Sequence, residues 1–231
     1  MKKILFLLAM SALSLVAFET TNIQLLYGEN FKGDSFVYDT KDGKKTTVTF
    51  EHFRTFSYGD FYMFVDMADG KKFDGTEHDV YAEIAPRFSL SKVSGSNLSV
   101  GLLKDIFLAT QINEGKDYAA YLGGVGADFE IPGFNVFSLN IYYKSENIED
   151  NSFQFTPVYQ TKEFYGVHFE GFIDMTSRDI GTQNQLLYNL DAFLGMKEKI
   201  YLGTEWVYYD YDHNRVRAKT SATQVMVKYQ F

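Results

Sequence analysis

The chain has 231 residues, a net charge of −8, 22 Phe, 17 Tyr and no Cys. The acidic balance excludes a basic stripe of the kind that binds nucleic acid, and the absence of Cys excludes a disulfide framework and thiol chemistry. No segment after residue 18 approaches the roughly 18 consecutive apolar residues of a membrane helix, so the many large apolar side chains need another explanation.

The first residues predict an export signal. Lys2 and Lys3 form a short positive region, and an apolar run follows from Ile4 to Ala17. Such a run is typical of a cleaved signal peptide and is too short to span a bilayer. We expect cleavage after Ala17, although Leu15 is larger than the small residue usual at that place. An uncleaved anchor is the alternative, but no stop-transfer flank follows. Residues 18–231 are predicted to form a single domain.

The rest of the chain alternates apolar and polar residues in segments of about ten, as half-buried strands do. We predict an all-β protein, a transmembrane antiparallel β-barrel of about twelve strands, since bacterial barrels have an even number; one misread hairpin would make it ten or fourteen. In chain order the predicted strands are Asn22–Glu29, Lys45–Thr55, Tyr58–Met67, Asp79–Leu90, Leu98–Gln111, Asp117–Glu130, Phe134–Lys144, Ser152–Gln160, Phe164–Met175, Gln183–Leu194, Lys199–Tyr209 and Ala218–Phe231.

The connections fall into two groups. Four short turns, at residues 57–60, 95–97, 131–133 and 147–150, contain the Gly, Pro, Asn or Asp that favour a reversal of the backbone. The segments Asn30–Lys44 and Ala68–His78 are longer and charged. Because outer-membrane barrels have short periplasmic turns and longer extracellular loops, we assign the four turns to the periplasmic side and the two long segments to the outside.

The last predicted strand carries the strongest membrane signal. A two-residue period separates an apolar face from a more polar one, with Val225, Val227, Tyr229 and Phe231 opposite Gln224, Met226, Lys228 and Gln230. A closing strand that ends on an aromatic residue is typical of bacterial outer-membrane barrels. We therefore expect localisation in the Gram-negative outer membrane, contact with its lipid, and recognition of Phe231 by the barrel-assembly machinery.

The same alternation predicts which side chains point into the lumen. In the third strand Phe61, Met63, Val65 and Met67 oppose Asp60, Tyr62, Phe64 and Asp66, and the fourth, seventh and ninth strands separate in the same way. A Lys or Arg facing lipid costs about 2–4 kcal/mol near the bilayer midplane. The polar faces should therefore line the lumen. Tyr143, Tyr165, Phe169, Trp206 and Tyr229 should face the lipid as part of an aromatic girdle.

The segment Glu83–Leu90 (Glu-Ile-Ala-Pro-Arg-Phe-Ser-Leu), with Lys92 and the run 97–101, resembles the Tsx-like family of nucleoside-specific channel-forming porins. The similarity extends over roughly residues 45–145. It implies a monomeric outer-membrane barrel of twelve strands with a narrow lumen that binds and passes nucleosides. The chain is shorter than the best-known members and has one Trp, Trp206, so another small polar solute is an open alternative.

A nucleoside channel needs aromatic faces for the base and polar groups for the ribose hydroxyls, and it must bind weakly enough to release its solute. The predicted lumen aromatics are Tyr62, Phe64, Tyr81, Tyr142 and Phe172. The predicted lumen acids are Glu51, Asp60, Asp66, Glu83, Asp128, Glu170, Asp174, Asp191 and Glu205, and the bases are Arg87, Lys144 and Lys228. We predict that Glu83 and Arg87 form a structural pair. For Tyr62, Phe172 and Asp174, structural and binding roles are equally supported.

Other functions have weaker support in the sequence. The four His residues lack the spacing of a metal site, and no cofactor is implied. An enzyme of the outer-membrane hydrolase type would need a linked nucleophile and base, but no motif joins His168 to Ser152 or Ser177. We therefore predict a channel and not an enzyme. The alternative class is a non-transporting barrel that acts through its surface loops as an adhesin or phage receptor.

Overall fold

The computed structural model describes residues 18–31, 40–71, 78–191, 199–212 and 217–231. The predicted signal peptide, residues 1–17, lies outside this range, as do His213 and most of the two long segments assigned to the outside. Within the described part, no helix is long and apolar enough to cross a bilayer.

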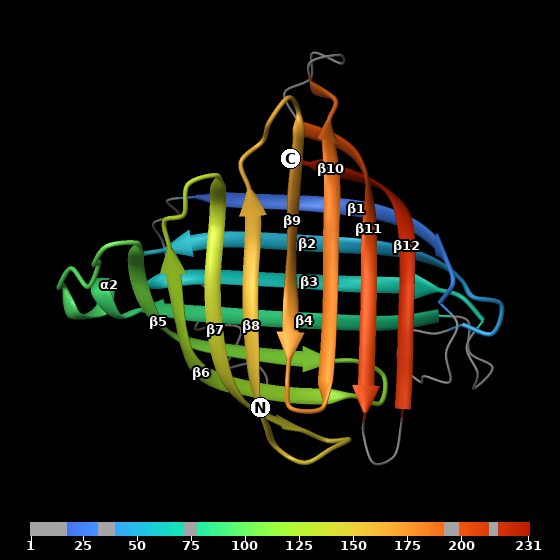
Figure 1. Ribbon diagram of the computed structural model, residues 1–231, viewed down its shortest axis with the longest axis horizontal. Coiled ribbons are helices and arrows are strands. Elements are labelled where there is room, and N and C mark those ends of the chain that lie inside the picture. The colour runs from blue at the N-terminus through green and yellow to red at the C-terminus, as the bar shows by residue number, and fades with distance from the viewer. Residues whose placement is uncertain (1–17, 32–39, 72–77, 192–198, 213–216) are drawn as a thin grey trace, which may run out of the picture.

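Twelve antiparallel strands form a closed barrel, so the predicted fold and strand number are confirmed (Figure 1). The elements are β1 Glu19–Glu29, β2 Lys44–Phe56, β3 Gly59–Asp69, β4 His78–Ser89, α2 Leu90–Ser94, β5 Leu103–Glu114, β6 Ala119–Phe129, β7 Phe134–Glu146, β8 Ser152–Thr161, β9 Val167–Met175, β10 Asp179–Asn189, β11 Lys199–Asp212 and β12 Arg217–Gln230.

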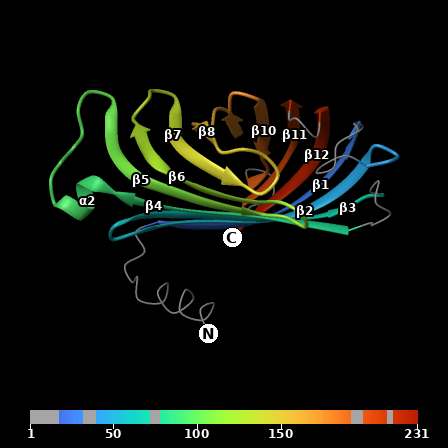
Figure 2. The same ribbon diagram turned by 90° about the horizontal axis from the view of Figure 1, so that it is seen from below.

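Each strand pairs with its neighbours in sequence, and β1 pairs with β12 to close the sheet. The closing register runs from Asn22 opposite Gln230 to Glu29 opposite Thr223. Strands on the two sides of the barrel cross at a steep angle, and β1–β4 lie behind β7–β12 in Figure 1. Figure 2 shows the curved wall of the remaining strands arching over β2–β4. Closure leaves no free sheet edge.

The chain reverses at every connection, so successive connections lie at opposite ends of the barrel. We call the end that holds Glu19 and Gln230 the turn end; it carries the connections 57–58, 90–102, 130–133 and 162–166. The other end, the loop end, carries 30–43, 70–77, 115–118, 147–151 and 176–178. The assignment of residues 147–150 to the same side as the other short turns was therefore wrong, because they lie with the long segments.

Two strands begin at least three residues later than predicted. β5 starts at Leu103 and not at Leu98, because Gly101 turns the chain with a φ of 58° and the Leu103 N–H donates to the Val100 carbonyl at 2.9 Å. The short helix α2 precedes this turn; the Ser89 hydroxyl caps it by accepting a 3.0 Å hydrogen bond from the Lys92 N–H, and Gly95 ends it at a φ of 70°. β9 starts at Val167 and not at Phe164, because Tyr165 and Gly166 turn the chain with φ values of 49° and 79°. Local backbone reversals therefore override the apolar pattern.

β10 was placed four residues too late in the sequence reading. It runs from Asp179 to Asn189, whereas the prediction began at Gln183 and ended at Leu194. Asp191 therefore follows the strand, where its N–H donates to the Asn189 side chain at 2.9 Å. Its assignment as a lumen acid was wrong, because it is not on a strand face.

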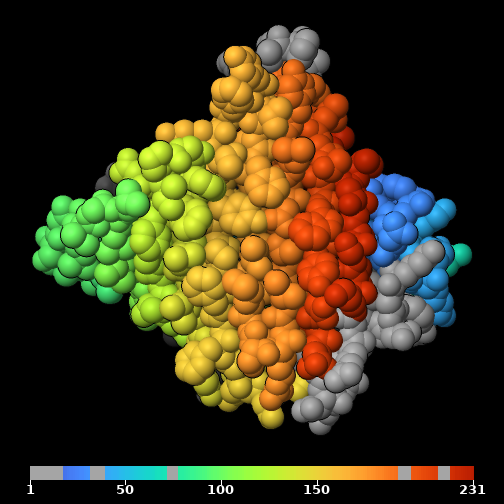
Figure 3. All heavy atoms as spheres, in the orientation of Figure 1, coloured from blue at the N-terminus to red at the C-terminus, as the bar shows by residue number. Residues whose placement is uncertain are grey.

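The two faces of the wall have opposite chemistry. Apolar side chains such as Leu25, Phe153 and Val225 are exposed on the outer face, whereas Gln24 and Lys228 are buried inside. The predicted facing of the third, fourth, seventh, ninth and last strands follows this alternation. Side chains cover the outer surface of β6–β12 continuously (Figure 3). An apolar exterior around a polar interior is the arrangement that a bilayer requires.

Candidate functional site

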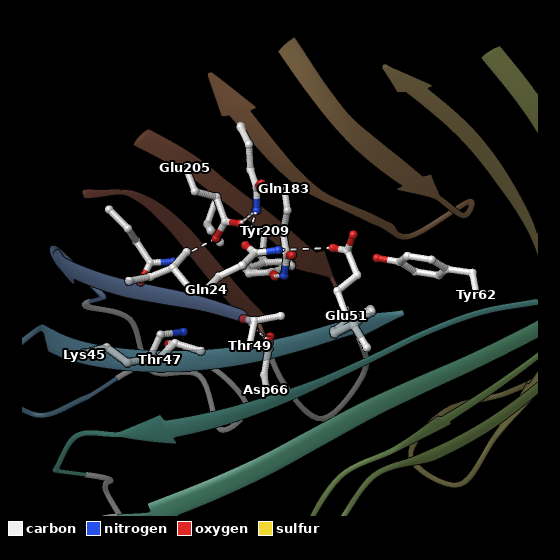
Figure 4. Close-up of a pocket in the computed structure, with 15 residues that line it drawn as sticks. Gln24, Lys45, Thr47, Thr49, Glu51, Tyr62, Asp66, Gln183, Glu205 and Tyr209 are labelled. Atoms are coloured by element: carbon white, nitrogen blue, oxygen red, sulfur yellow. Dashed lines mark hydrogen bonds between the residues drawn. The ribbon is translucent and has the colours of Figure 1, made fainter. Parts of the chain in front are cut away.

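A cavity of about 40 Å³ lies against the inner face of six neighbouring strands, β10–β12 and β1–β3 (Figure 4). We call it the amide pocket, because four glutamines contribute to its wall. That volume has room for a few water molecules. Its lining residues are Gln24, Leu26, Lys45, Thr47, Thr49, Glu51, Tyr62, Phe64, Asp66, Gln183, Gln185, Glu205, Val207, Tyr209 and Gln224.

Glu205 is held by neutral donors. Its two carboxylate oxygens accept hydrogen bonds from Gln185 Nε2 at 2.8 Å and from Gln224 Nε2 at 2.9 Å. The three side chains come from adjacent strands, since Glu205 lies opposite Gln185 on β10 and opposite Gln224 on β12. The two-residue period that turns apolar groups outward therefore brings these polar groups together inside.

Glu51 has a similar environment on the other side of the closing strands. Its oxygens accept from Asn22 Nδ2 at 3.0 Å and from Gln24 Nε2 at 3.2 Å. Gln24 Oε1 in turn accepts from Gln185 Nε2 at 2.9 Å, which connects this group to the one around Glu205. Asp66 completes the acids of the pocket and accepts from Thr49 Oγ1 at 2.5 Å.

Aromatic rings continue from the amide pocket along the inner wall. The Tyr62 and Phe64 ring centroids are 6.1 Å apart, and Phe64 lies 5.9 Å from Tyr81. Tyr81 then stacks on Tyr118 at 6.3 Å, with 28° between the ring planes. On the opposite side of the pocket the Tyr209 hydroxyl accepts from Gln183 Nε2 at 2.9 Å. This part of the inner wall therefore offers flat apolar faces beside hydrogen-bonding groups.

Phe31, from the connection between β1 and β2, folds inward at the loop end. It is fully buried and packs with Val207, Tyr209 and Ala222, all on the inner face. The Lys45 ammonium lies 4.0 Å from the centroid of its ring. Because Val207, Tyr209 and Lys45 also line the amide pocket, Phe31 covers the pocket on the side that faces the loop end.

A charged brace lies near the turn end. Arg87 donates two hydrogen bonds to Asp60, at 2.9 and 2.7 Å, and two to Asp128, at 2.8 and 3.2 Å. Its guanidinium carbon lies 4.3 Å from the Phe107 ring centroid. Because Phe107 is on β5, between the strands that carry Arg87 and Asp128, the guanidinium lies against the wall. We call Arg87, Asp60 and Asp128 the arginine brace.

The predicted pair of Glu83 and Arg87 was wrong. Both residues are on β4, four positions apart, which separates them by about 13 Å along a strand. Glu83 instead accepts from the Tyr81 hydroxyl at 2.6 Å and from Gln111 Nε2 at 2.8 Å. The prediction correctly gave both side chains an inward direction but ignored their separation.

Lys228 forms a second charged contact. Its ammonium lies 2.5 Å from Glu170 Oε1 and 3.9 Å from Glu51 Oε1. Glu170 also accepts from Gln160 Nε2 at 2.6 Å. The contact joins β12 to β9 and β2, so it crosses part of the interior. Lys144, by contrast, pairs locally with Glu146 on its own strand at 2.9 Å.

The remaining predicted residues are spread over the inner wall. Asp174 accepts from Thr156 Oγ1 at 2.6 Å and from Gln154 Nε2 at 2.9 Å. Tyr142 is buried in a cluster with Ala109, Ala120 and Leu122, which makes it a packing residue. Phe172, on β9, lies opposite Gln183 of the amide pocket.

The structure thus divides the predicted site. Glu51, Tyr62, Asp66 and Glu205 line the amide pocket, whereas Asp60, Arg87, Asp128 and Lys228 form charged contacts nearer the turn end. The sequence reading missed Lys45, Thr47, Tyr209 and the four glutamines Gln24, Gln183, Gln185 and Gln224. Neutral amides at alternate positions, as in Gln183 and Gln185, were the available signal. Among the residues with described positions, no three His, Cys, Asp or Glu side chains gather as a metal site.

Comparison with known proteins gives the family. The model of the family described as nucleoside-specific channel-forming protein, Tsx matches residues 27–179. Outer membrane protein OmpK of Vibrio parahaemolyticus is 27% identical over 128 residues, which are 50% of this chain and 49% of that protein. OmpK from the O3:K6 strain RIMD 2210633 is 26% identical over 134 residues, with 50% of each chain covered. The match therefore spans about half the length of these relatives.

Solved structures support the fold. The KdgM porin superposes with a TM-score of 0.53 at 11% sequence identity, covering 92% of this chain and 99% of the porin. The KdgM porin in complex with disordered oligogalacturonate gives a TM-score of 0.52 at 11% identity, with 91% and 99% covered. At this identity the likeness concerns the barrel alone.

Proposed function

Since this chain belongs to the family of Tsx nucleoside-specific channel-forming proteins, we propose that its barrel passes nucleosides or similar small polar solutes by passive, selective diffusion. The chain is a Gram-negative outer-membrane protein of the channel class. We also propose that the barrel is monomeric and that the barrel-assembly machinery inserts it by recognising Phe231. The concentration gradient drives the movement, and the lumen side chains shape the barrier.

The amide pocket with its neighbouring rings is the observation that carries the proposal. A nucleoside has a flat base and a sugar with several hydroxyls. Tyr62 and Phe64 offer ring faces for the base, and stacking contributes about 1–3 kcal/mol per base by alanine substitution. The carboxylates of Glu51, Asp66 and Glu205 are acceptors for hydroxyl donors. Both kinds of group line the same pocket.

Passage needs movement of side chains in this barrel. The cavity of about 40 Å³ holds only a few water molecules, so a nucleoside must displace side chains such as the Phe31 ring and the glutamines. Displacement weakens binding, and weak binding suits a channel because a tightly held solute does not leave. The small cavity therefore supports slow, selective passage and does not support a wide aqueous pore.

Uptake by liposomes tests the proposal. Vesicles that contain the pure full-length chain should admit radiolabelled nucleoside faster than a size-matched sugar. Equal rates would point to a general pore. No uptake of either solute would point to a barrel that acts through its surface loops, as an adhesin or phage receptor.

A double substitution tests the aromatic contribution. Tyr62→Ala with Phe172→Ala should weaken nucleoside block of the channel current by about tenfold, since one stacked base contributes about 1–3 kcal/mol. The control is Phe153→Ala, which removes an exposed ring from the outer face and should leave block unchanged. Unchanged block in the double variant would remove both residues from the solute path.

A further inference from the structure

Several hydrogen-bond acceptors in the wall of the amide pocket lack a donor. A carboxylate only accepts hydrogen bonds, so Gln185 and Gln224 must both turn their NH₂ groups toward Glu205. Their carbonyl oxygens then point elsewhere. Gln185 Oε1, Gln224 Oε1 and the Thr47 hydroxyl oxygen are all buried and lack a hydrogen-bond partner within the described part of the chain. All three residues line the pocket.

Two of the three orphan oxygens belong to well-buried side chains, since Thr47 is 5% exposed and Gln224 is 2% exposed. An unpartnered buried acceptor costs free energy until a donor reaches it. Thr47 could donate its own proton, but its oxygen can still accept two bonds. The three oxygens therefore favour a ligand that donates several hydrogen bonds.

The charge of the pocket points to the same chemistry. Three carboxylates line it, from Glu51, Asp66 and Glu205, against the single ammonium of Lys45. That ammonium lies over the Phe31 ring, at the pocket's loop-end cover. The hydrogen bonds that Asp66 and Glu205 accept come from neutral groups, a hydroxyl and two amides.

We propose that the amide pocket is a binding site for a protonated amine, and that it makes the channel prefer cationic solutes. An ammonium group has three donors and a positive charge, so it can interact with the orphan oxygens and with the carboxylates of Asp66 and Glu205 together. Rings of acidic side chains select cations in other channels. The inference deepens the proposed function: among nucleoside-like solutes, one that carries an amine binds best.

The test uses the full-length chain in planar bilayers and three probes that differ only at the 5′ position of the sugar. Adenosine is neutral, 5′-amino-5′-deoxyadenosine is cationic at neutral pH, and adenosine 5′-monophosphate is anionic. We expect block of the ionic current to be about tenfold stronger for the amine than for adenosine, as charge-assisted hydrogen bonds imply, and weakest for the phosphate. In a KCl gradient without probe, the reversal potential should show preference for K⁺ over Cl⁻.

Three variants test whether the preference for the amine arises in the amide pocket. Glu205→Gln keeps the shape and removes the charge, so it should abolish the advantage of the amine and reduce the K⁺ preference. Thr47→Val removes one orphan oxygen without changing charge, so it should weaken amine block while leaving the reversal potential unchanged. Glu114→Gln is the matched control, because Glu114 is exposed on the outer-face alternation of β5 at the loop end and should alter neither readout.

The outcomes separate this inference from the proposed function. If adenosine blocks the current but the three probes block equally, or the phosphate blocks best, the amine site is wrong and the nucleoside channel stands. If no nucleoside probe blocks but the channel prefers K⁺ and Glu205→Gln removes that preference, the nucleoside assignment is wrong and the cationic pocket stands. Chloride preference in the unaltered chain would overturn the inference directly.

Discussion

Buried carboxylates have different hydrogen-bond partners in two regions of the inner wall. In the arginine brace, Asp60 and Asp128 share one guanidinium, and each forms a charged hydrogen bond of 2.9 Å or shorter with it. In the amide pocket, Glu205 and Asp66 are held by neutral amides and a hydroxyl. Both regions are polar and buried, and both lie on the same barrel, yet only in the first does a cation hydrogen-bond directly to both carboxylates.

The difference separates structural charges from charges available to a solute. A buried ion pair whose partners satisfy each other has little left to offer a passing molecule. A carboxylate fixed by neutral donors has its orientation set before a solute arrives. The chemical identity of the donors, more than the number of acids, therefore marks the part of the lumen in which we propose that selection takes place.

The largest effect is predicted for a substitution that breaks the arginine brace. Arg87→Met removes the countercharge of Asp60 and Asp128, and removing one member of a buried pair costs about 3–5 kcal/mol. Urea unfolding from lipid vesicles, followed by the fluorescence of the single Trp, Trp206, should show a loss of that size.

Two further variants serve as controls in this experiment. Lys199→Met removes an exposed cation from the start of β11 and should leave the unfolding midpoint unchanged. Adding Asp60→Asn to Arg87→Met should restore part of the stability, because it removes one of the stranded charges. A wild-type midpoint for Arg87→Met alone would show that the brace contributes nothing.

Much of the barrel was predictable because the bilayer imposes a simple rule. Apolar side chains must face hydrocarbon, so the period of two fixed the inward set in β3, β4 and β7 without any contact information. The boundaries failed where local chemistry interrupted that period. Gly101 turns the chain within the segment expected to begin β5, and Tyr165 and Gly166 turn it where β9 was expected to start.

The site was less predictable, since direction alone does not specify partners. Glu83 and Arg87 both point inward, but the register sets Arg87 opposite Asp60 and Glu83 opposite Asn113. The amide pocket depends on residues from β10 and β2 that only barrel closure brings to one cavity. The prediction selected mainly charged residues. It overlooked Gln185 and Gln224, which orient Glu205 but carry no charge.

A smaller effect is expected for a substitution in the second region, at the ring that covers the amide pocket. Phe31→Ala removes a fully buried ring that packs on Val207 and Tyr209. The cost should fall below the about 3–5 kcal/mol of a Phe→Ala change in a closed core, because water can enter from the loop end. Single-channel conductance should rise, since the ring no longer covers the pocket.

Bilayer recordings check this directly. Phe88→Ala is the matched control, because Phe88 is an exposed ring on the outer face of β4. Its conductance should equal that of the unaltered chain. If Phe31→Ala also leaves the conductance unchanged, ions bypass the amide pocket, and the contrast between the two regions has no bearing on permeation.

The smallest predicted effect concerns an ion pair outside both regions. Lys219 Nζ donates to Asp210 Oδ2 at 2.8 Å between β12 and β11, and the two side chains are 66% and 40% exposed. Exposed pairs contribute little to stability, because water screens them and both side chains must be ordered. Lys219→Met should therefore shift the urea midpoint far less than Arg87→Met, although each substitution removes one positive charge. A loss as large as that of the arginine brace would mean that burial does not set the value of these charges, and the distinction between paired structural charges and exposed ones would fail.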